Sequence, residues 1–248
     1  MYLSKSSIIP YGVAGIKDSI SKAIRPKFVG WNPSTSFLGS IANKTFSSLI
    51  DFGKGNWTIK PSISLLLSIN PKKDVDGFHP TNFGQMALEM ESFIPATQYG
   101  IIELLERYNI ETSGKNCVVI GRSNIVGRPI SILLSQKSAK GNATVILTHS
   151  RTKNIEFFTK RADIIVSDLG IPEFLKSEMV KEDAVIIDVG ITRVIDKTKE
   201  KGYVIKGDVD FLNVSKKASA ITPVPGGVGP MTISMLLKNT LIACQRKD

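Results

Sequence analysis

The chain has 248 residues, of which 42% are hydrophobic and 22% charged, and its formal net charge is +10. Such a length allows one large or two small domains, and the composition is ordinary for a soluble globular protein. The sequence has no apolar run long enough to cross a bilayer and no recognisable signal peptide. We therefore expect no membrane association and a cytoplasmic location.

The positive charge does not by itself predict binding to nucleic acid. The lysines and arginines are scattered, without a long basic run and without the interleaved aromatic residues that stack bases. We therefore expect no nucleic-acid partner. The two cysteines, Cys117 and Cys244, lie far apart, which argues against a disulfide framework or a metal site. Cys117 falls in a predicted core strand, where a thiol acts as a small hydrophobic group.

Residues 1–60 are the least clearly patterned part of the chain, because their hydrophobic periodicity is poor. The elements that the pattern allows before Asn116 are helices over residues 15–24, 36–52, 82–90 and 97–108, and a strand or short helix within residues 57–69.

A loop is predicted over residues 70–80, because prolines, a glycine and two aspartates follow one another closely there. It carries Asp74, Asp76 and His79. Such residues are common in purely structural turns, yet loops with aspartate and histidine are also where binding and catalytic residues gather. The residues alone leave both interpretations open.

From Asn116 onward, short β-branched runs alternate with short amphipathic segments. This alternation predicts an α/β fold with a doubly wound parallel sheet and right-handed crossovers. The predicted strands are residues 117–120, 144–148, 163–166, 184–188 and 220–221, and the predicted helices are residues 129–136, 155–159, 176–179 and 231–243.

The first of these strands runs into a glycine-rich turn, Gly121 to Gly127, and then into a helix with Pro129 in its first turn. A strand, a tight glycine turn and a helix N-terminus together present free N–H groups to a phosphate. The spacing is G-x-S-x-x-x-G, with Ser123 where the usual dinucleotide-binding pattern has a second glycine. Because this pattern is loose, a purely structural turn explains these residues about equally well.

The second strand ends at His149, Ser150 and Arg151, without the acidic residue that binds the adenosine ribose in NAD enzymes of this architecture. Arg151 and Arg122 offer planar cationic groups that suit a phosphate dianion, and Ser150 can donate a hydrogen bond. These residues predict NADP rather than NAD as the cofactor. For His149 we favour a packed histidine at a strand end.

The stretch from Ile221 to Thr232 is dense in proline and glycine. Prolines fix φ, glycines allow close approach to the backbone, and Pro230 is predicted to start the last helix. A structural turn would need only one or two of these residues. The stretch therefore predicts a backbone shaped around a flat ligand at the mouth of the sheet.

Six blocks of sequence together resemble the bifunctional methylenetetrahydrofolate dehydrogenase/methenyltetrahydrofolate cyclohydrolase family. They are KDVDGFHP (73–80), GRSNIVGRP (121–129), HSRTKN (149–154), IDVGITRV (187–194), GDVDF (207–211) and ITPVPGGVGPMT (221–232). The resemblance implies two domains. Residues 1–112 would form a reduced α/β folate-binding catalytic domain, joined by the C-terminal helix over residues 231–248. Residues 113–230 would form an NADP-binding, Rossmann-like domain.

The resemblance also implies the chemistry. Members of this family transfer a hydride from 5,10-methylenetetrahydrofolate to NADP and then hydrolyse the methenyl product to 10-formyltetrahydrofolate, commonly as homodimers. Tetrahydrofolate derivatives would thus be the substrates, and Asp76 would hydrogen-bond the pterin ring. The other residues that we expect in the site are Gly121, Arg122, Ser123, Ser150, Arg151 and Ile191 for the cofactor, and Pro225, Gly226 and Gly227 along the folate cleft.

The chain departs from the family pattern at several positions. The Tyr-x-x-x-Lys pair of an N-terminal helix is absent in any register of residues 36–44, which leaves Lys44 as the candidate catalytic lysine. A Gln-Leu-Pro-Leu-Pro loop is missing, and Gln98 stands in place of a proline. Asp168 takes a position that is usually small and apolar, where a carboxylate could repel the cofactor phosphates.

These departures leave a rival to the active bifunctional enzyme. It is a catalytically impaired NADP-binding homologue that acts as a binding or partner subunit. The missing loop favours this rival, whereas Asp76 and the segment from Pro225 to Gly229 oppose it. Since hydride transfer depends mainly on alignment and hydrolysis on a positioned acid or base, we expect the cyclohydrolase step to be the weaker one.

Overall fold

The computed structural model describes residues 7–8 and 67–246, and every structural statement below concerns these residues. The predictions over residues 15–24 and 36–52, most of residues 57–69, and Lys44 lie outside them. None of the helices in the described ranges is long and apolar enough to cross a membrane.

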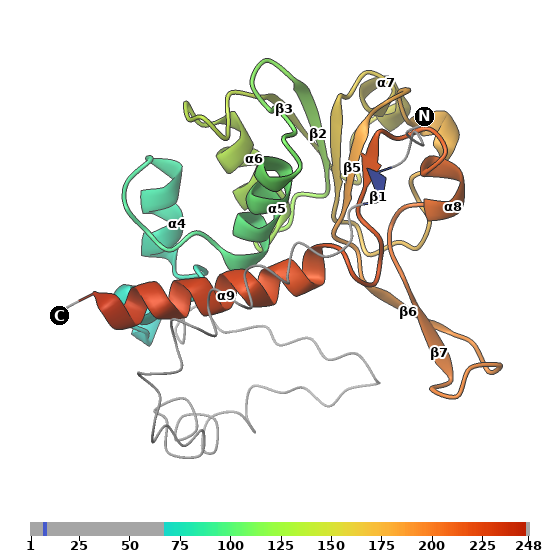
Figure 1. Cartoon of the computed structure of the whole chain (residues 1–248). Helices are drawn as coiled ribbons and strands as arrows, with labels where there is room; N and C mark the ends of the chain where they lie inside the picture. Colours follow the sequence, from blue (N-terminus) through green and yellow to red (C-terminus); the bar gives the residue numbers. More distant parts are fainter. Residues whose placement is uncertain (1–6, 9–66, 247–248) are drawn as a thin grey trace, which may run out of the picture.

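A six-stranded, wholly parallel sheet forms the centre of the described part (Figure 1), in the spatial order β1-β8-β5-β4-β2-β3. The strands are β1 (Ser7–Ile8), β2 (Asn116–Ile120), β3 (Thr144–Thr148), β4 (Ile164–Ser167), β5 (Val185–Asp188) and β8 (Ala220–Ile221). Strand β2 has β3 on one side and β4 on the other, so the direction of winding reverses between β2 and β4. The predicted α/β, doubly wound parallel sheet is confirmed.

Both faces of the sheet are buried, as the continuous apolar strands require. Alternate residues of β2 join two separate core clusters, Cys117 and Val119 on one face and Val118 and Ile120 on the other. Burial raises the pKa of the Cys117 thiol to about 12, which agrees with its expected role as a small hydrophobic group.

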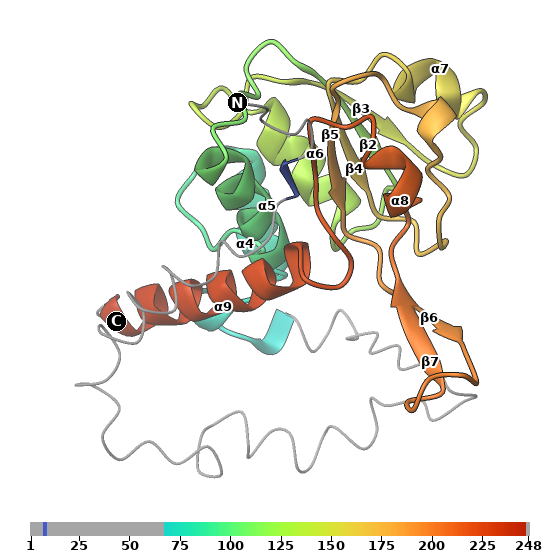
Figure 2. The same ribbon diagram turned by 45° about the vertical axis from the view of Figure 1, so that its right-hand side comes forward.

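Helices cover both faces (Figures 1 and 2). The first face carries α4 (Pro80–Ala87), α5 (Ala96–Arg107), α6 (Gly127–Ser135) and α9 (Val228–Gln245). The second face carries α7 (Ile155–Thr159), the 3₁₀ helix η4 (Ser177–Met179) and α8 (Phe211–Val214). Helix α9 packs against α5, the helix that precedes β2.

All five strands predicted after residue 116 form, each within one residue of its expected bounds. Helices are less well delimited. The segment predicted as a helix over residues 176–179 is only the 3₁₀ turn η4. The last helix begins at Val228 rather than at Pro230, which lies at its third position, where its missing N–H is still unneeded.

An antiparallel hairpin was missed, formed by β6 (Thr192–Ile195) and β7 (Tyr203–Lys206). It projects away from the body of the sheet (Figure 2). Two β-branched runs flanking a polar turn with Gly202 carried the signal for it. Helix α8 was also missed, since four residues are too few for periodicity to be read.

Candidate functional site

The carboxyl ends of the parallel strands bring the predicted cofactor residues to one edge of the sheet. Gly121 follows β2, Asp168 follows β4, and the two meet where the winding reverses, the usual place for a ligand in such a sheet. The predicted residues in the segments that follow the strands are Gly121, Arg122, Ser123, Ser150, Arg151, Ile191, Pro225, Gly226 and Gly227.

The turn after β2 needs both of its glycines. Gly121 has a φ of +113°, and a Cβ there would overlap the carbonyl oxygen of Asp168. A Cβ on Gly127 would overlap the carbonyl oxygen of Gly121. The turn is thus folded tightly against the end of β4 before it opens into α6.

Ser123 closes this turn from inside. Its Oγ accepts hydrogen bonds from the N–H groups of Val126 (2.9 Å) and Gly127 (3.1 Å) and donates one to Oδ2 of Asp168 (2.6 Å). Asp168 therefore contacts the predicted phosphate-binding turn directly.

The turn after β3 is held by its own hydrogen bonds. The N–H of His149 donates to Thr152 Oγ1 (2.9 Å), and the N–H of Arg151 donates to His149 Nδ1 (3.1 Å), so His149 has the structural role that we favoured. This geometry leaves Ser150 and Arg151 exposed. Their side chains, like that of exposed Arg122, make no hydrogen bond or ion pair with the described residues.

The exposed guanidinium groups come from neighbouring strands. Ile120 of β2 lies opposite Thr148 of β3, and Arg122 and Ser150 each follow two residues later. No described acidic side chain pairs with Arg122 or Arg151. This cationic edge suits a phosphate dianion better than a bare ribose.

Two buried aspartates that sequence reasoning assigned no role fasten the segments after β4 and β5. Asp188 accepts from the N–H groups of Gly190 (3.0 Å), Asp208 (3.1 Å) and Val209 (3.0 Å). Asp208 accepts from the N–H groups of Leu169 (2.6 Å) and Ile171 (3.0 Å). For Asp188, the signal in the sequence was an acidic residue directly after the apolar run over residues 184–187, whereas Asp208 follows Lys206 and Gly207 and had no such signal.

The stability of the fold should respond to pH through Asp188. Burial raises the pKa of this carboxyl to about 6, and the charge of Asp208 also raises it, although backbone N–H groups oppose the shift. The native state thus favours the protonated form, whose contribution is complete below the ordinary pKa and is lost as the pH rises through about 6. This loss should amount to about 3 kcal/mol.

Urea unfolding of the native chain and of Asp188→Asn, between pH 4 and pH 7.5, measures this effect. The Asn variant has no titrating group there, so its free energy of unfolding relative to the native chain should rise across this range. A difference that is constant with pH would contradict the assignment.

Ile191 lies just before the hairpin strand β6 and is 65% exposed. Its side chain is thus accessible at the same edge of the sheet. Gly190, directly before it, packs against the carboxylate of Asp208, which a Cβ at this position would overlap. The buried aspartates therefore fix the backbone that presents Ile191.

The proline- and glycine-rich segment after β8 forms a tight turn into α9. Thr222 Oγ1 accepts from the N–H of Asp188 (2.7 Å), which ties the segment to the end of β5. The N–H of Gly227 donates to Pro223 O (2.8 Å) and closes the turn. Gly227 is buried, whereas Pro225 and Gly226 are exposed. The turn thus presents these two residues at the surface.

The two aspartates of the 70–80 loop have different environments. Asp74 is buried, and its Oδ2 accepts from the N–H of His79 (2.7 Å) and from Asn82 Nδ2 (2.9 Å). Asp76 keeps an exposed face, and its carboxylate makes no hydrogen bond or ion pair with the described residues. Partial desolvation, and then the charge of Asp74, raise the pKa of Asp76. Asp74 therefore shapes the loop, and Asp76 is left available to a ligand.

Helix α9 and the start of α5 hold this loop in place. Asn239 of α9 is buried and donates to the carbonyl oxygens of Val75 (2.8 Å) and Ile94 (3.0 Å). Gly77 has a φ of +76°, and a Cβ there would lie 2.6 Å from the nitrogen of Pro95. The position of Asp76 is thus fixed by packing between elements far apart in sequence.

Gln98 joins α5 to the glycine turn. Its fully buried amide donates through Nε2 to the carbonyl oxygens of Ile125 (2.7 Å) and Val126 (3.3 Å). Its Oε1 has no hydrogen-bond partner among the described residues. This departure from the family pattern therefore has a structural role that a proline could not supply.

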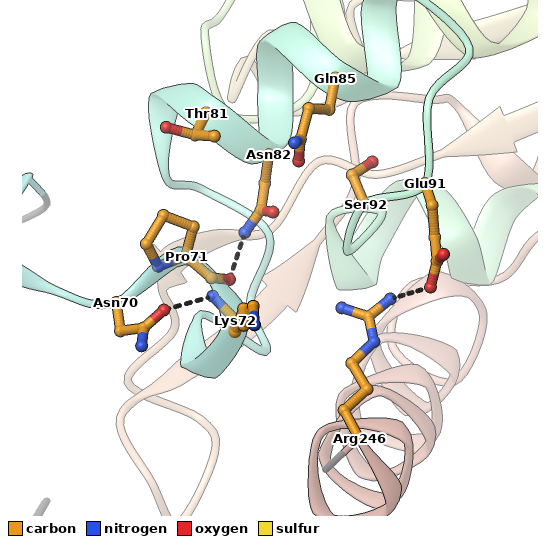
Figure 3. Close-up of a pocket in the computed structure, with 9 residues that line it drawn as sticks. All are labelled: Asn70, Pro71, Lys72, Thr81, Asn82, Gln85, Glu91, Ser92 and Arg246. Carbon is orange, nitrogen blue, oxygen red and sulfur yellow. Dashed lines mark hydrogen bonds and ion pairs between the residues drawn. The ribbon is translucent and has the colours of Figure 1, made fainter. Parts of the chain in front are cut away.

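A cavity of about 510 Å³ lies beside the 70–80 loop (Figure 3). An ion pair between Arg246 and Glu91 (2.7 Å) borders it. Its lining residues are Asn70, Pro71, Lys72, Thr81, Asn82, Gln85, Glu91, Ser92 and Arg246. None of the predicted site residues is among them, so this cavity is separate from the edge of the sheet described above.

Comparison with known proteins agrees with the sequence blocks. Residues 95–248 match the family model described as the NAD(P)-binding domain of tetrahydrofolate dehydrogenase/cyclohydrolase. The bifunctional protein FolD of Flavobacterium johnsoniae is 73% identical over 179 residues, which cover 72% of this chain and 61% of that protein. The chain thus spans about three fifths of the length of this relative.

Solved structures show the same relationship. The bifunctional dehydrogenase/cyclohydrolase FolD of Campylobacter jejuni is 49% identical, with a TM-score of 0.68 over 74% of this chain and 62% of that one. The Trypanosoma brucei enzyme, solved with NADP and an inhibitor, is 41% identical, with a TM-score of 0.70 over 76% of this chain and 64% of that one.

Proposed function

This chain belongs to the tetrahydrofolate dehydrogenase/cyclohydrolase family, and from that membership we propose that it is an enzyme of folate one-carbon metabolism. It oxidises 5,10-methylenetetrahydrofolate to 5,10-methenyltetrahydrofolate with NADP and hydrolyses the product to 10-formyltetrahydrofolate. The proposal rests chiefly on the edge of the sheet where the tight glycine turn and two exposed arginines meet. NADPH formation from these substrates tests it.

Within this proposal, Arg122, Arg151 and Ser150 bind the cofactor, together with the backbone of Gly121 and the exposed side chain of Ile191. Their exposure and lack of described partners support that role. NADP supplies the hydride acceptor when bound. The protein residues hold substrate and cofactor in register, since hydride transfer needs alignment rather than a protein nucleophile.

The substrate side of the proposal assigns Asp76 to the pterin ring. An unpaired carboxylate can accept hydrogen bonds from ring N–H groups, and its raised pKa is typical of a functional position. Pro225, Gly226 and Gly227 border the folate. Residues 1–112 with the last helix then form the folate-binding domain, and residues 113–230 form the cofactor domain.

Replacing Arg122 with alanine should weaken the binding of NADP more than the binding of NAD. A hydrogen bond to a charged group contributes about 1.5–3 kcal/mol, so the dissociation constant for NADP should rise about tenfold or more. Calorimetric titration with each cofactor measures this, with Arg107→Ala on α5 as the control for loss of one arginine. Equal weakening of NAD and NADP would contradict the assignment of Arg122 to the 2′-phosphate.

The hydrolysis step is assigned to Lys44, and we propose that it is slower than in relatives that keep the tyrosine-lysine pair. A positioned acid or base contributes about 10²–10⁴-fold in rate. Lys44→Met should therefore abolish the remaining hydrolysis of methenyltetrahydrofolate while dehydrogenation persists, and Lys54→Met serves as the matched control. Hydrolysis that is indifferent to Lys44→Met would exclude this lysine.

We further propose that the chain acts in the cytoplasm as a homodimer, as the family resemblance implies. Sedimentation equilibrium tests the dimer. An impaired NADP-binding homologue remains the second candidate function, and the contact between Asp168 and Ser123 is the observation that favours it.

A further inference from the structure

Asp168 lies where the winding of the sheet reverses, against the predicted phosphate-binding turn. Its N–H donates to Ile120 O at the end of β2 (2.8 Å), and its carbonyl oxygen packs on Gly121. Because the backbone of Asp168 makes both of these contacts, its side chain is held beside the turn.

The hydrogen bond to Asp168 takes up the last hydrogen-bonding capacity of Ser123. A hydroxyl has one proton to donate and two lone pairs to accept with. Both lone pairs are taken by the N–H groups of Val126 and Gly127, and the proton is taken by Asp168. Ser123 therefore has no donor left for a cofactor phosphate while this contact lasts.

The carboxylate also faces the groups that would attract a phosphate. Desolvation, and to a smaller extent the charge of Asp208, raise the pKa of Asp168. The hydrogen bond from Ser123 and the N–H of Gly127 lower it. That N–H belongs to the first residue of α6, whose N-terminus favours negative charge. No ion pair with a described residue neutralises Asp168.

We propose that Asp168 sets the cofactor affinity of this chain by occupying, as an internal anion, the Ser123 hydroxyl donor of the glycine turn that a phosphate of NADP would otherwise use. The inference rests on the proposed function and adds a residue that opposes binding. A cofactor phosphate has to displace this side chain from Ser123 and to approach a like charge.

The test is calorimetric titration of NADP into the native chain, Asp168→Asn and Asp168→Ala. Asparagine keeps the size of the side chain and removes its charge, and alanine removes both. Since hydrogen bonds to charged groups are at stake, both variants should bind NADP about ten- to a hundredfold more tightly, alanine at least as tightly as asparagine. Asp196→Asn, in the exposed β6–β7 turn, makes the same change in net charge and should leave affinity unchanged.

A double-variant cycle tests the link to Ser123. Ser123→Ala removes the contacts with Val126 and Gly127 in either background, but it should cost about tenfold more NADP affinity in the Asp168→Ala background than in the native chain, where the hydroxyl proton is already taken. Urea unfolding of each variant shows whether it is folded.

Two outcomes overturn the inference, and they have different consequences for the proposed function. If the native chain binds NADP and the Asp168 variants bind it no more tightly, the inference is wrong and the cofactor assignment stands. If neither the native chain nor any variant binds NADP, both are wrong. Tight NADP binding by the Asp168 variants, without binding by the native chain, supports both the inference and the cofactor assignment.

Discussion

Gly121→Ala should lower the free energy of unfolding by about 4 kcal/mol or more, the range reached only by exceptional substitutions. The added Cβ would overlap the carbonyl oxygen of Asp168. The backbone fixes the position of the Cβ, and the oxygen is itself a backbone atom, so neither can turn aside. A φ of +113° adds strain for any residue other than glycine. Cofactor binding should be lost as well, because the turn has to open away from β4. Urea unfolding and NADP titration measure the two effects.

Gly114→Ala is the matched control. Gly114 also has a positive φ, +70°, but a Cβ there meets no atom within 4 Å. Its substitution should cost only the conformational strain, about 1–2 kcal/mol, and should leave NADP binding intact. Equal losses of stability in the two variants would show that overlap with Asp168 is unimportant.

Asp76→Ala should reduce kcat/KM for methylenetetrahydrofolate by about a hundredfold, because one or more hydrogen bonds to a carboxylate at 1.5–3 kcal/mol each would be lost. The dissociation constant for NADP and the urea midpoint should change little, since Asp76 bonds to no described residue through its side chain. Steady-state kinetics in folate, with NADP saturating, gives the first quantity.

Asp74→Ala separates this role from a structural one. Asp74 is buried and accepts two hydrogen bonds, so its loss should cost about 2–4 kcal/mol of stability. If instead Asp76→Ala lowers the urea midpoint and leaves folate kinetics unchanged, Asp76 is a turn residue and the substrate assignment fails.

Five of the six strands could be predicted, and four of them, β2, β4, β5 and β8, are buried on both faces. The two-residue strand β1 was missed. Continuous β-branched runs such as the one from Cys117 to Ile120 have few other uses, and each was located within one residue. The hairpin β6–β7 was missed because its strands alternate between half-buried and exposed residues rather than forming an apolar run.

The candidate site could be predicted in part. The sequence pointed to the segments that follow the strands. Residue patterns did not distinguish Asp74 from Asp76, and only the family resemblance singled out Asp76, since their environments depend on His79 and Asn82 folding over Asp74 alone. Likewise, repulsion of the cofactor by Asp168 was expected from charge, whereas its hydrogen bond to Ser123 depends on the pairing of β2 with β4. Such tertiary contacts leave no local pattern.

The most direct test of the proposed function follows the absorbance of NADPH after the native chain is mixed with methylenetetrahydrofolate and NADP. We predict NADPH formation that saturates in both substrates, is much slower with NAD, and falls in Arg122→Ala and Asp76→Ala. A folded chain, shown by a cooperative urea transition, that forms NADPH no faster than a mixture without protein would contradict the assignment as a dehydrogenase.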